Sequence, residues 1–282
     1  MTVIFDGKAF AKKHGKALKT TIANLKRQGI QPAFCVINIG QDPASKVYVH
    51  VKARRATALG LKQQIIQLSA DITTAAVVAK IRELNADEAV HGIMVQLPLP
   101  AGLDTNQILE SINPEKDIDC LTATNIGRLW QGNHFIEPAT AAGVMALLQD
   151  YQVPLAGKNC VILGRSKIVG KPLAALMLEA NATVTVVHSH SRNLAAQARA
   201  ADVLVCAVGK PNFVTPEMVK PGAVVVDVGI NHWHGQLVGD VDYEAVYPKA
   251  GMITPVPGGI GPVTVEFLMA GVVKLTRRRY GC

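Results

Sequence analysis

The sequence has few cysteines and no apolar run long enough to cross a membrane. Its five cysteines (Cys35, Cys120, Cys160, Cys206 and Cys282) are odd in number, widely spaced and without a C-x-x-C pair. This pattern excludes a disulfide framework and indicates reduced thiols in a cytoplasmic compartment. No apolar stretch reaches the roughly 18 residues of a membrane span, and the N-terminus lacks the features of a signal peptide. We therefore expect a cytoplasmic protein with no membrane partner.

Aromatic residues are also scarce, at 5% of the chain. The formal net charge of +8 would be compatible with nucleic-acid binding, but the basic residues are scattered and no aromatic stacking platform accompanies them. The run Arg277-Arg278-Arg279 is more simply the cationic end of a helix. A positive field that attracts small polyanions, such as phosphorylated cofactors or carboxylates, explains the charge without a nucleic-acid partner.

Apolar runs and helical periodicity alternate along the chain in two series. In the first series, strands are predicted at 33–39, 64–68 and 92–95, and helices at 8–28, from Asp42-Pro43 to Gly60, and at 73–85. In the second series, strands are predicted at 159–163, 183–188, 203–207 and 223–227, and helices at 140–152, 169–179, 193–201 and 215–219. This alternation is typical of parallel sheets covered by helices, so the fold class is α/β.

Two domains follow from the restart of the alternation near Pro138. We place an N-terminal three-layer domain at 1–138 and a C-terminal Rossmann-type domain at 139–282, with a cleft between them. The last helix, at about 263–282, can pack back on the first domain. At 282 residues the chain is long enough for two such cores.

One predicted helix carries three polar side chains on a single face. Ser45, Tyr48 and Lys52 are spaced i, i+3, i+7, which places them on one side of a helix. An adjoining stripe is expected to be buried: Val47, Val51 and Ala58. Partial burial beside that stripe would lower the pKa of Lys52 and allow it to transfer protons near neutral pH. The alternative is an ordinary amphipathic helix in which Lys52 reaches out to solvent and Tyr48 is half-buried.

The second domain contains a turn suited to a dinucleotide. Val161 to Pro172 reads as a strand, a glycine turn at Gly164-Arg165-Ser166, and a helix start, an order that lets backbone N–H groups hold a pyrophosphate. The next strand ends in His188-Ser189-His190 and lacks the acid that NAD-binding chains place there. Together with Arg165, this favours NADP over NAD. The alternative is an ordinary strand–helix turn. No metal is expected, because neither His188-x-His190 nor His232-x-His234 has a cysteine or carboxylate nearby.

Three further segments have the composition of loops that line a site. Asp227-Val-Gly229-Ile230 follows a strand at the edge where open α/β sheets bind ligands. The segment Thr254 to Thr264 is rich in proline and glycine, which fixes an unusual backbone path. An apolar strand also delivers Gln96 into the proline-rich sequence V-Q-L-P-L-P, where its carboxamide can hydrogen-bond a buried lysine. A structural turn is the alternative for the Thr254 to Thr264 segment.

Taken together, the ordered motifs resemble one enzyme family. They are S-x-x-Y-x-x-x-K, V-Q-L-P-L-P, P-x-K-D-I-D (Pro114 to Asp119), G-R-S-x-x-V-G-x-P and T-P-V-P-G-G-I-G-P. In this order the chain resembles the bifunctional methylenetetrahydrofolate dehydrogenase/methenyltetrahydrofolate cyclohydrolase family from about Phe5 to the last helix. The resemblance implies NADP-dependent oxidation of 5,10-methylenetetrahydrofolate followed by hydrolysis to 10-formyltetrahydrofolate. It also implies a homodimer made through the NADP domains, and tetrahydrofolate substrates with polyglutamylated forms among the candidates.

The resemblance assigns roles to individual residues. Lys52 is the catalytic lysine, Tyr48 stacks on the folate, Gln96 positions Lys52, and Asp119 binds the pterin; all four are counted as catalytic. The remaining substrate-binding positions are Ser45, Leu97, Pro257, Gly258 and Pro262. The cofactor-binding positions are Gly164, Arg165, Ser166, Ser189, Ile230 and Thr140. No metal ligand is implied.

Two departures from the family pattern affect these expectations. Cys120 follows the pterin aspartate, where the family usually has glycine; if that position needs a positive φ, the cysteine is strained. The family's P-C-T-P-x-G reads here Pro138-Ala-Thr140-Ala-Ala-Gly143. The alternatives are another two-domain NADP-dependent dehydrogenase, for amino or hydroxy acids, and a catalytically degenerate folate-binding paralogue. Gln96 and Asp119 argue against the amino- or hydroxy-acid dehydrogenase. The degenerate paralogue is disfavoured because Tyr48 and Lys52 are retained together with Gln96 and Asp119.

Overall fold

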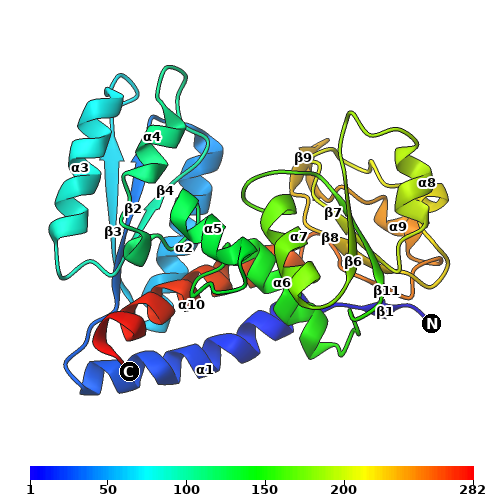
Figure 1. The fold of residues 1–282 in the computed structure, drawn as a ribbon, viewed down its shortest axis with the longest axis horizontal. Helices are drawn as coiled ribbons and strands as arrows, with labels where there is room; N and C mark the ends of the chain where they lie inside the picture. Colours follow the sequence, from blue (N-terminus) through cyan, green and yellow to red (C-terminus); the bar gives the residue numbers. More distant parts are fainter. The chain divides into compact units, whose positions relative to one another are not determined.

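The chain forms two compact units that interleave along the sequence (Figure 1). The computed structural model describes the backbone of residues 1–282 and the side chains of residues 1–42 and 49–282. Residues 1–13 and 138–267 form one unit, here called the six-stranded unit; residues 14–137 and 268–282 form the other, the three-stranded unit. These units differ from the contiguous ranges 1–138 and 139–282 in residues 1–13, and in residues 268–282 with the end of the last helix, for which packing on the first domain was among the expectations.

The departure has a simple physical cause. Strand β1 (Val3–Ile4) pairs in parallel with β11 (Met252–Ile253), so the first residues complete a sheet made by the second half of the chain. Helices α1 (Gly7–Arg27) and α10 (Ile260–Tyr280) each contribute residues to both units. Near both chain ends the boundary therefore falls within a helix, where no composition change marks it in the sequence.

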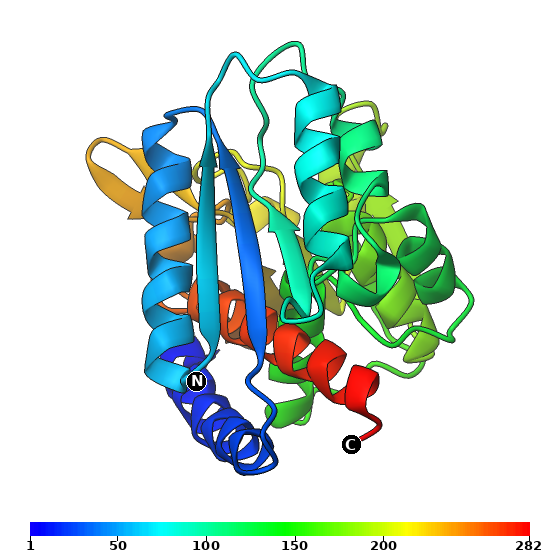
Figure 2. The same cartoon turned by 90° about the vertical axis from the view of Figure 1, so that its left-hand side faces the viewer.

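The three-stranded unit is built on a parallel sheet in the order β3-β2-β4. Its strands are β2 (Ala33–Ile39), β3 (Lys62–Leu68) and β4 (Gly92–Val95). All residues of the central strand β2 and of β4 are buried, which is why both strands are continuous apolar runs in the sequence. In Figure 2 these strands lie between α2 (Pro43–Leu59) and α3 (Thr74–Ala86).

Alternate residues of β2 face opposite layers of this unit. Cys35, Ile37 and Ile39 pack in one core with Val77 and Ile81 of α3 and with residues of α4 (Thr105–Glu110). Lys52 of α2 instead contacts Met94, whose sheet partner Val36 belongs to the other face. The predicted three-layer arrangement is thereby confirmed. The unit also contains the 3-10 helix η1 (Pro114–Lys116) and α5 (Ala123–Trp130).

The six-stranded unit is a parallel sheet in the order β1-β11-β8-β7-β5-β6. Besides β1 and β11 its strands are β5 (Asn159–Leu163), β7 (Val203–Cys206), β8 (Val224–Asp227) and the edge strand β6 (Thr183–Val187). The covering helices are α6 (Ala139–Asp150), α7 (Gly170–Glu179), α8 (Leu194–Arg199), the 3-10 helix η2 (Pro216–Met218) and α9 (Tyr243–Val246). The chain passes from β5 to β6 on one side and then to β7 on the other, so the strand order reverses at β5. The predicted Rossmann-type α/β class is confirmed.

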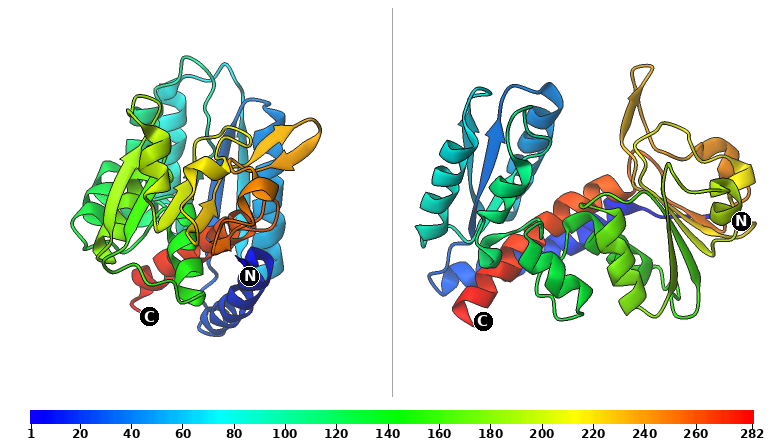
Figure 3. Two further views of the ribbon diagram at one scale, coloured as in Figure 1. Left: turned by 90° about the vertical axis from the view of Figure 1, so that its right-hand side faces the viewer. Right: turned by 45° about the horizontal axis from the view of Figure 1, so that its top comes forward.

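A short antiparallel hairpin of β9 (Asn231–Trp233) and β10 (Gln236–Val238) projects from this unit (Figure 3). It was not predicted, because its strands are only three residues long. A cluster of buried aliphatic residues from β5, β7, β8 and η2 forms the core beneath the sheet. Within the described part of the chain, no helix is both long and apolar enough to cross a membrane.

Candidate functional site

Helix α2 places Lys52 on its buried face. Val49, Ala56 and Leu59 are buried there, and with Lys52 they recur at i, i+3, i+7 and i+10. The prediction that Val51 and Ala58 form the buried stripe is wrong, because both are exposed. The helix is rotated so that the lysine itself points into the unit. The predicted Ser45, Tyr48 and Val47 side chains lie outside the described residues.

Lys52 is held by two groups from β4 and its end. Its Nζ donates to Gln96 Oε1 at 3.1 Å and lies 3.5 Å from the sulfur of Met94. Gln96 Nε2 donates in turn to the carbonyl oxygen of Leu97 at 2.7 Å. That second bond fixes the carboxamide so that its oxygen faces the lysine. The predicted Lys52–Gln96 contact is present, whereas Met94 was missed; its place two residues before Gln96 on one strand face would have revealed it.

Burial lowers the pKa of Lys52, and the nearby carboxylate of Asp119 opposes that shift. Asp119 is partly buried; burial raises its pKa to about 6, while Lys52 lowers it and Asp117 raises it further. The structure therefore brings Lys52, Gln96 and Asp119 together. A lysine with a lowered pKa beside an acid with a raised one is a pair able to exchange protons near neutral pH.

The neighbouring residues of the K-D-I-D segment have structural roles. Lys116 Nζ donates to the carbonyl oxygens of Leu84 and Asp87 at 2.9 and 2.7 Å, at the end of α3, where a cation is favourable. Asp117 is fully buried and accepts hydrogen bonds from the backbone of Leu121 and Thr122. These bonds fix the backbone on both sides of Asp119.

Cys120 adopts a left-handed backbone conformation, as expected if the glycine that the family usually has at this position is needed for a positive φ. Its φ is 56°, a region that glycine occupies without strain. The thiol is fully buried and donates to the carbonyl oxygen of Ile136 at 3.3 Å. The pKa of this thiol is raised, mainly because the thiol is buried. The cysteine is therefore an unreactive packing residue in a strained position.

In the six-stranded unit, the predicted dinucleotide turn lies at the point where the strand order reverses. Gly164 has a φ of 114°, and a Cβ there would lie 2.2 Å from the carbonyl oxygen of Ala207. A Cβ on Gly170 would lie 2.1 Å from the carbonyl oxygen of Gly164. Both glycines are therefore required for close packing of turn, sheet and helix. Ser166 Oγ accepts from the backbone of Val169 at 3.1 Å and thereby stabilises the start of α7.

Arg165 and the end of β6 lie side by side. Leu163 and Val187 are register partners, and the N–H of Gly164 donates to Val187 at 2.8 Å. Ser189 and Arg165 are both exposed. The pKa of His188 is lowered by partial burial and by the nearby Arg165 and His190 side chains. This edge therefore combines cationic groups with a free hydroxyl, which suits a phosphate.

The remaining predicted cofactor positions lie elsewhere in the six-stranded unit. Ile230 is 40% exposed just beyond the end of β8. Thr140 Oγ1, in the first turn of α6, accepts from Thr264 at 3.2 Å. A Cβ on Gly143 would lie 2.9 Å from a methyl group of Val263, so the glycine permits α6 and α10 to pack closely. Pro257 belongs to the loop that leads into α10, in which Gly258 has a φ of 115°, and Pro262 lies in the first turn of α10 itself.

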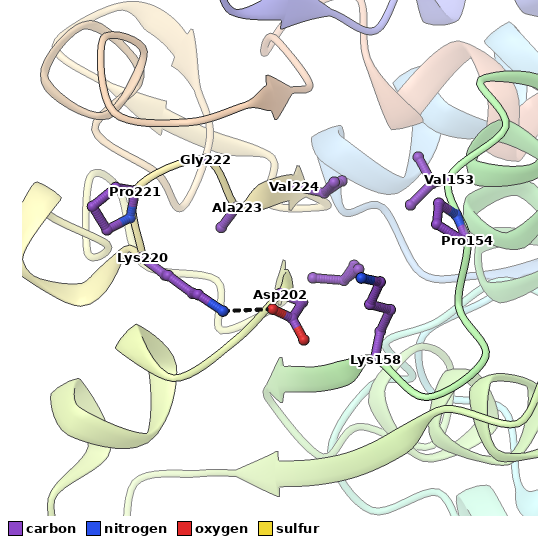
Figure 4. Close-up of a pocket in the computed structure, with 10 residues that line it drawn as sticks. Val153, Pro154, Lys158, Asp202, Lys220, Pro221, Gly222, Ala223 and Val224 are labelled. Carbon is purple, nitrogen blue, oxygen red and sulfur yellow. Dashed lines mark hydrogen bonds and ion pairs between the residues drawn. The ribbon is translucent and has the colours of Figure 1, made fainter.

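A hollow of about 330 Å³ is present at the opposite, amino edge of the same sheet (Figure 4). Its charged groups are Lys158 and the ion pair of Lys220 with Asp202, at 2.6 Å. Lys220 and Asp202 are 48% and 32% exposed, so the pair lies in solvent. None of the predicted site residues lines this hollow, and we assign it no role. Within residues 1–42 and 49–282, no three His, Cys, Asp or Glu side chains are grouped as metal ligands.

Comparison with known proteins agrees with the geometry. The family model for the catalytic domain of tetrahydrofolate dehydrogenase/cyclohydrolase matches residues 5–119. The model for the NAD(P)-binding domain of the same family matches residues 138–280. The chain belongs to the tetrahydrofolate dehydrogenase/cyclohydrolase family. The resemblance found in the sequence is confirmed, and the chain is an enzyme of folate one-carbon metabolism.

Relatives of this family match over nearly their whole length. The bifunctional protein FolD of Lactobacillus delbrueckii subsp. bulgaricus is 59% identical over 281 residues, which cover 100% of this chain and 99% of the relative. A crystal structure of the Campylobacter jejuni bifunctional enzyme is 43% identical with a TM-score of 0.97, covering 99% and 100% of the two chains. The Trypanosoma brucei enzyme, complexed with NADP cofactor and inhibitor, is 40% identical with a TM-score of 0.95, covering 100% and 99%.

Proposed function

We propose that this chain oxidises 5,10-methylenetetrahydrofolate with NADP and then hydrolyses the methenyl product to 10-formyltetrahydrofolate. The observation that carries the proposal is the partly buried Lys52, whose pKa is lowered by burial and whose Nζ is held 3.1 Å from Gln96 Oε1. The family match supports this reading over a dehydrogenase of amino or hydroxy acids. The retained Lys52–Gln96 contact argues against a degenerate paralogue.

Lys52 is the proton carrier of the hydrolytic step. Water adds to the methenyl carbon and must lose a proton, and a ring nitrogen must gain one as the resulting carbinolamine opens. A lysine with a lowered pKa can serve both transfers near neutral pH. Gln96 orients the amine without titrating, and its own orientation is set by Leu97. Hydride transfer from the one-carbon bridge is assisted by the lone pair of the adjacent folate nitrogen, so it needs no protein base.

Asp119 recognises the pterin. The amino-pyrimidinone edge presents adjacent N–H donors, which two carboxylate oxygens can accept together. Its pKa of about 6 leaves the group mainly ionised at neutral pH. By resemblance, Tyr48, Ser45 and Leu97 also contact the folate, as do Pro257, Gly258 and Pro262. Folates with polyglutamate tails are included among the substrates.

The carboxyl edge of the six-stranded unit fits NADP. The crowded Gly164 turn and the start of α7 provide the backbone geometry that holds a pyrophosphate, with Ser166 beside it. Arg165 and Ser189 are exposed at the adjoining strand end, where the adenosine 2′-phosphate would lie. Ile230 and Thr140 complete the set. When bound, NADP supplies the acceptor for the hydride.

The proposal also includes a homodimer and a cytoplasmic location. The first rests on the resemblance to the family, and the second on the pattern of widely spaced, unpaired cysteines. Analytical ultracentrifugation of the purified chain tests the dimer, which a monomer at micromolar concentration would contradict.

A spectrophotometric assay of the purified protein tests the proposed chemistry. NADPH formation from methylenetetrahydrofolate reports the dehydrogenase, and loss of methenyltetrahydrofolate absorbance reports the cyclohydrolase. Lys52→Met should lower cyclohydrolase activity by about 10²- to 10⁴-fold, the range of general acid–base catalysis. Dehydrogenase activity should fall less, through misplacement of the folate. Hydrolysis within about threefold of wild type would contradict the role of Lys52. Absence of both activities in the folded wild type would contradict the function.

A further inference from the structure

Two buried carboxylates lie behind the carboxyl edge of the six-stranded sheet, and none of the roles above uses them. Asp227 is the last residue of β8 and is 2% exposed; Asp240 follows β10 and is fully buried. Burying two like charges in one place is costly unless many hydrogen-bond donors surround them. The arrangement of those donors indicates what the pair does.

Asp240 joins the ends of two neighbouring strands. Its Oδ2 accepts the backbone N–H groups of Val208 and Gly209 at 2.6 and 3.0 Å, and its Oδ1 accepts that of Lys210 at 2.9 Å. These three residues form the loop that follows β7. Asp240 Oδ1 also accepts from Asn231 Nδ2 at 2.9 Å, just beyond the end of β8. One carboxylate therefore sets the path of the loop after β7 and ties Asn231 to it.

Asp227 links Asp240 to the rest of this edge. Its Oδ1 accepts the N–H groups of Gly229 and Asp240 at 2.9 and 3.0 Å, and its Oδ2 accepts that of Val241 at 2.8 Å. The N–H of Asp227 donates to Thr254 Oγ1 at 2.7 Å, where the proline-glycine loop begins. The network thus reaches three segments at the carboxyl edge of the sheet.

The backbone around the two carboxylates leaves no space for other side chains. A Cβ on Gly229 would lie 2.3 Å from Asp240 Oδ1, and one on Gly239 would lie 1.9 Å from Asp227 Oδ2. Burial and the charge of Asp240 raise the pKa of Asp227 to about 7, against its three backbone hydrogen bonds. Burial raises the pKa of the neighbouring Cys206 thiol, and the charges of Asp227 and Asp240 raise it further. The fold therefore accepts an electrostatic cost to keep both acids at this edge.

The location of this network relative to the proposed cofactor suggests its purpose. The 2′-phosphate end of NADP is proposed at β6 and the pyrophosphate at the turn after β5. In the sheet order β6-β5-β7-β8, the remaining half of a dinucleotide extends over the ends of β7 and β8. Those are the strand ends whose loops Asp240 holds.

We infer that Asp240 is a positioning residue that shapes the nicotinamide half of the cofactor site, by fixing the loop after β7 and Asn231 after β8. The inference rests on the proposed NADP function and adds a residue that sequence reasoning did not identify. Asp240 acts through backbone groups and a neighbouring side chain, and it need not touch the cofactor. Its loss should therefore affect one half of the cofactor more than the other.

Asp240→Asn tests the inference with two ligands. The amide keeps the size of the carboxylate but turns an NH₂ toward N–H donors that need an acceptor. The dissociation constants of NADP and of adenosine 2′,5′-bisphosphate, which lacks the nicotinamide, are measured by calorimetry. NADP affinity should fall by about 10- to 100-fold, which is the range expected when a hydrogen bond to a charged group is lost. Affinity for the bisphosphate should stay within about twofold of wild type, well below that range.

Two further variants keep the test decisive. Asn231→Ala removes one donor to Asp240 and leaves both acids in place, so it should lower NADP affinity in the same selective way. It replaces Asp240→Asn as the test if that variant does not fold. Asp242→Asn is the matched control, because Asp242 caps α9 through the backbone of Ala245 and contacts neither loop; it should leave both affinities unchanged. Equal losses for both ligands, or no loss for NADP, would overturn the inference. Failure of the wild type to bind NADP would instead overturn the proposed function.

Discussion

Replacing Gln96 with glutamate should move the pH dependence of the cyclohydrolase to higher pH. In the structure the carboxamide oxygen lies 3.1 Å from Lys52 Nζ. A carboxylate at that distance would favour the ammonium form by about 5 kcal/mol at an effective dielectric constant of about 20, and by about 1.3 kcal/mol in bulk water. These limits correspond to a rise of about 1 to 4 units in the pKa of Lys52.

The site lies between the two limits, because Lys52 is only partly buried. Burial lowers the pKa of the wild-type lysine, whereas the carboxylate of the variant would raise it, so a smaller share of the amine would be neutral at any given pH. The pH at which the hydrolysis rate increases should be higher in the variant by at least about one pH unit, and the rate at pH 7 should fall at least about tenfold. Gln96→Met is the control, because it removes the hydrogen bond to the ammonium without adding charge and should not move the profile upward.

The assay follows methenyltetrahydrofolate absorbance between pH 6 and 9, with the rate in enzyme-free buffer subtracted at each pH. Folding of each variant is checked by circular dichroism. An unchanged profile in Gln96→Glu, with folate still bound, would show that Lys52 does not titrate in the hydrolytic step. The proton-carrier mechanism would then be wrong.

Three further substitutions test other parts of the site. Asp119→Asn should raise the free energy of unfolding of the ligand-free protein at pH 8 by about 1–3 kcal/mol, because the pKa of Asp119 in the folded state, about 6, exceeds the ordinary 3.8. The ionised Asp119 of the wild type costs stability as the pH rises through this window. Urea unfolding should therefore show a smaller gain for the variant at pH 4 than at pH 8. Cys120→Gly relieves about 1 kcal/mol of strain at φ 56° but removes a buried thiol, so stability should change little. Folate affinity should be equal to that of the wild type or better. A tenfold loss of folate affinity would show that the thiol contributes to the folate pocket. Arg165→Ala should weaken NADP by about 1–3 kcal/mol and NAD far less, measured against the exposed control Arg199→Ala, and equal losses for both cofactors would contradict the 2′-phosphate assignment.

The sequence alone determined several of the buried strands and much of the local chemistry. Strands 33–39, 92–95 and 159–163 were predicted with the bounds that the structure shows. Buried parallel strands read as continuous apolar runs between turn residues, which makes them recognisable without a partner. The strained position of Cys120 was expected only through the resemblance, because the family usually has glycine there, and the φ of 56° agrees with that expectation. The short elements β1, β9, β10 and β11 were not predicted, since two or three residues carry no periodicity.

Only the tertiary structure decided which face of α2 is buried and which distant groups meet. Val51 and Ala58 fit a buried stripe as well as Val49 and Ala56 do, and packing against the sheet selected the second pair. Asp240 has no local signature, since its partners Val208, in the loop after β7, and Asn231, at the start of β9, lie 32 and 9 residues earlier in the chain. A carboxylate that accepts backbone N–H groups from distant segments is indistinguishable in sequence from a solvated turn residue, because every residue except proline carries the donor that it needs.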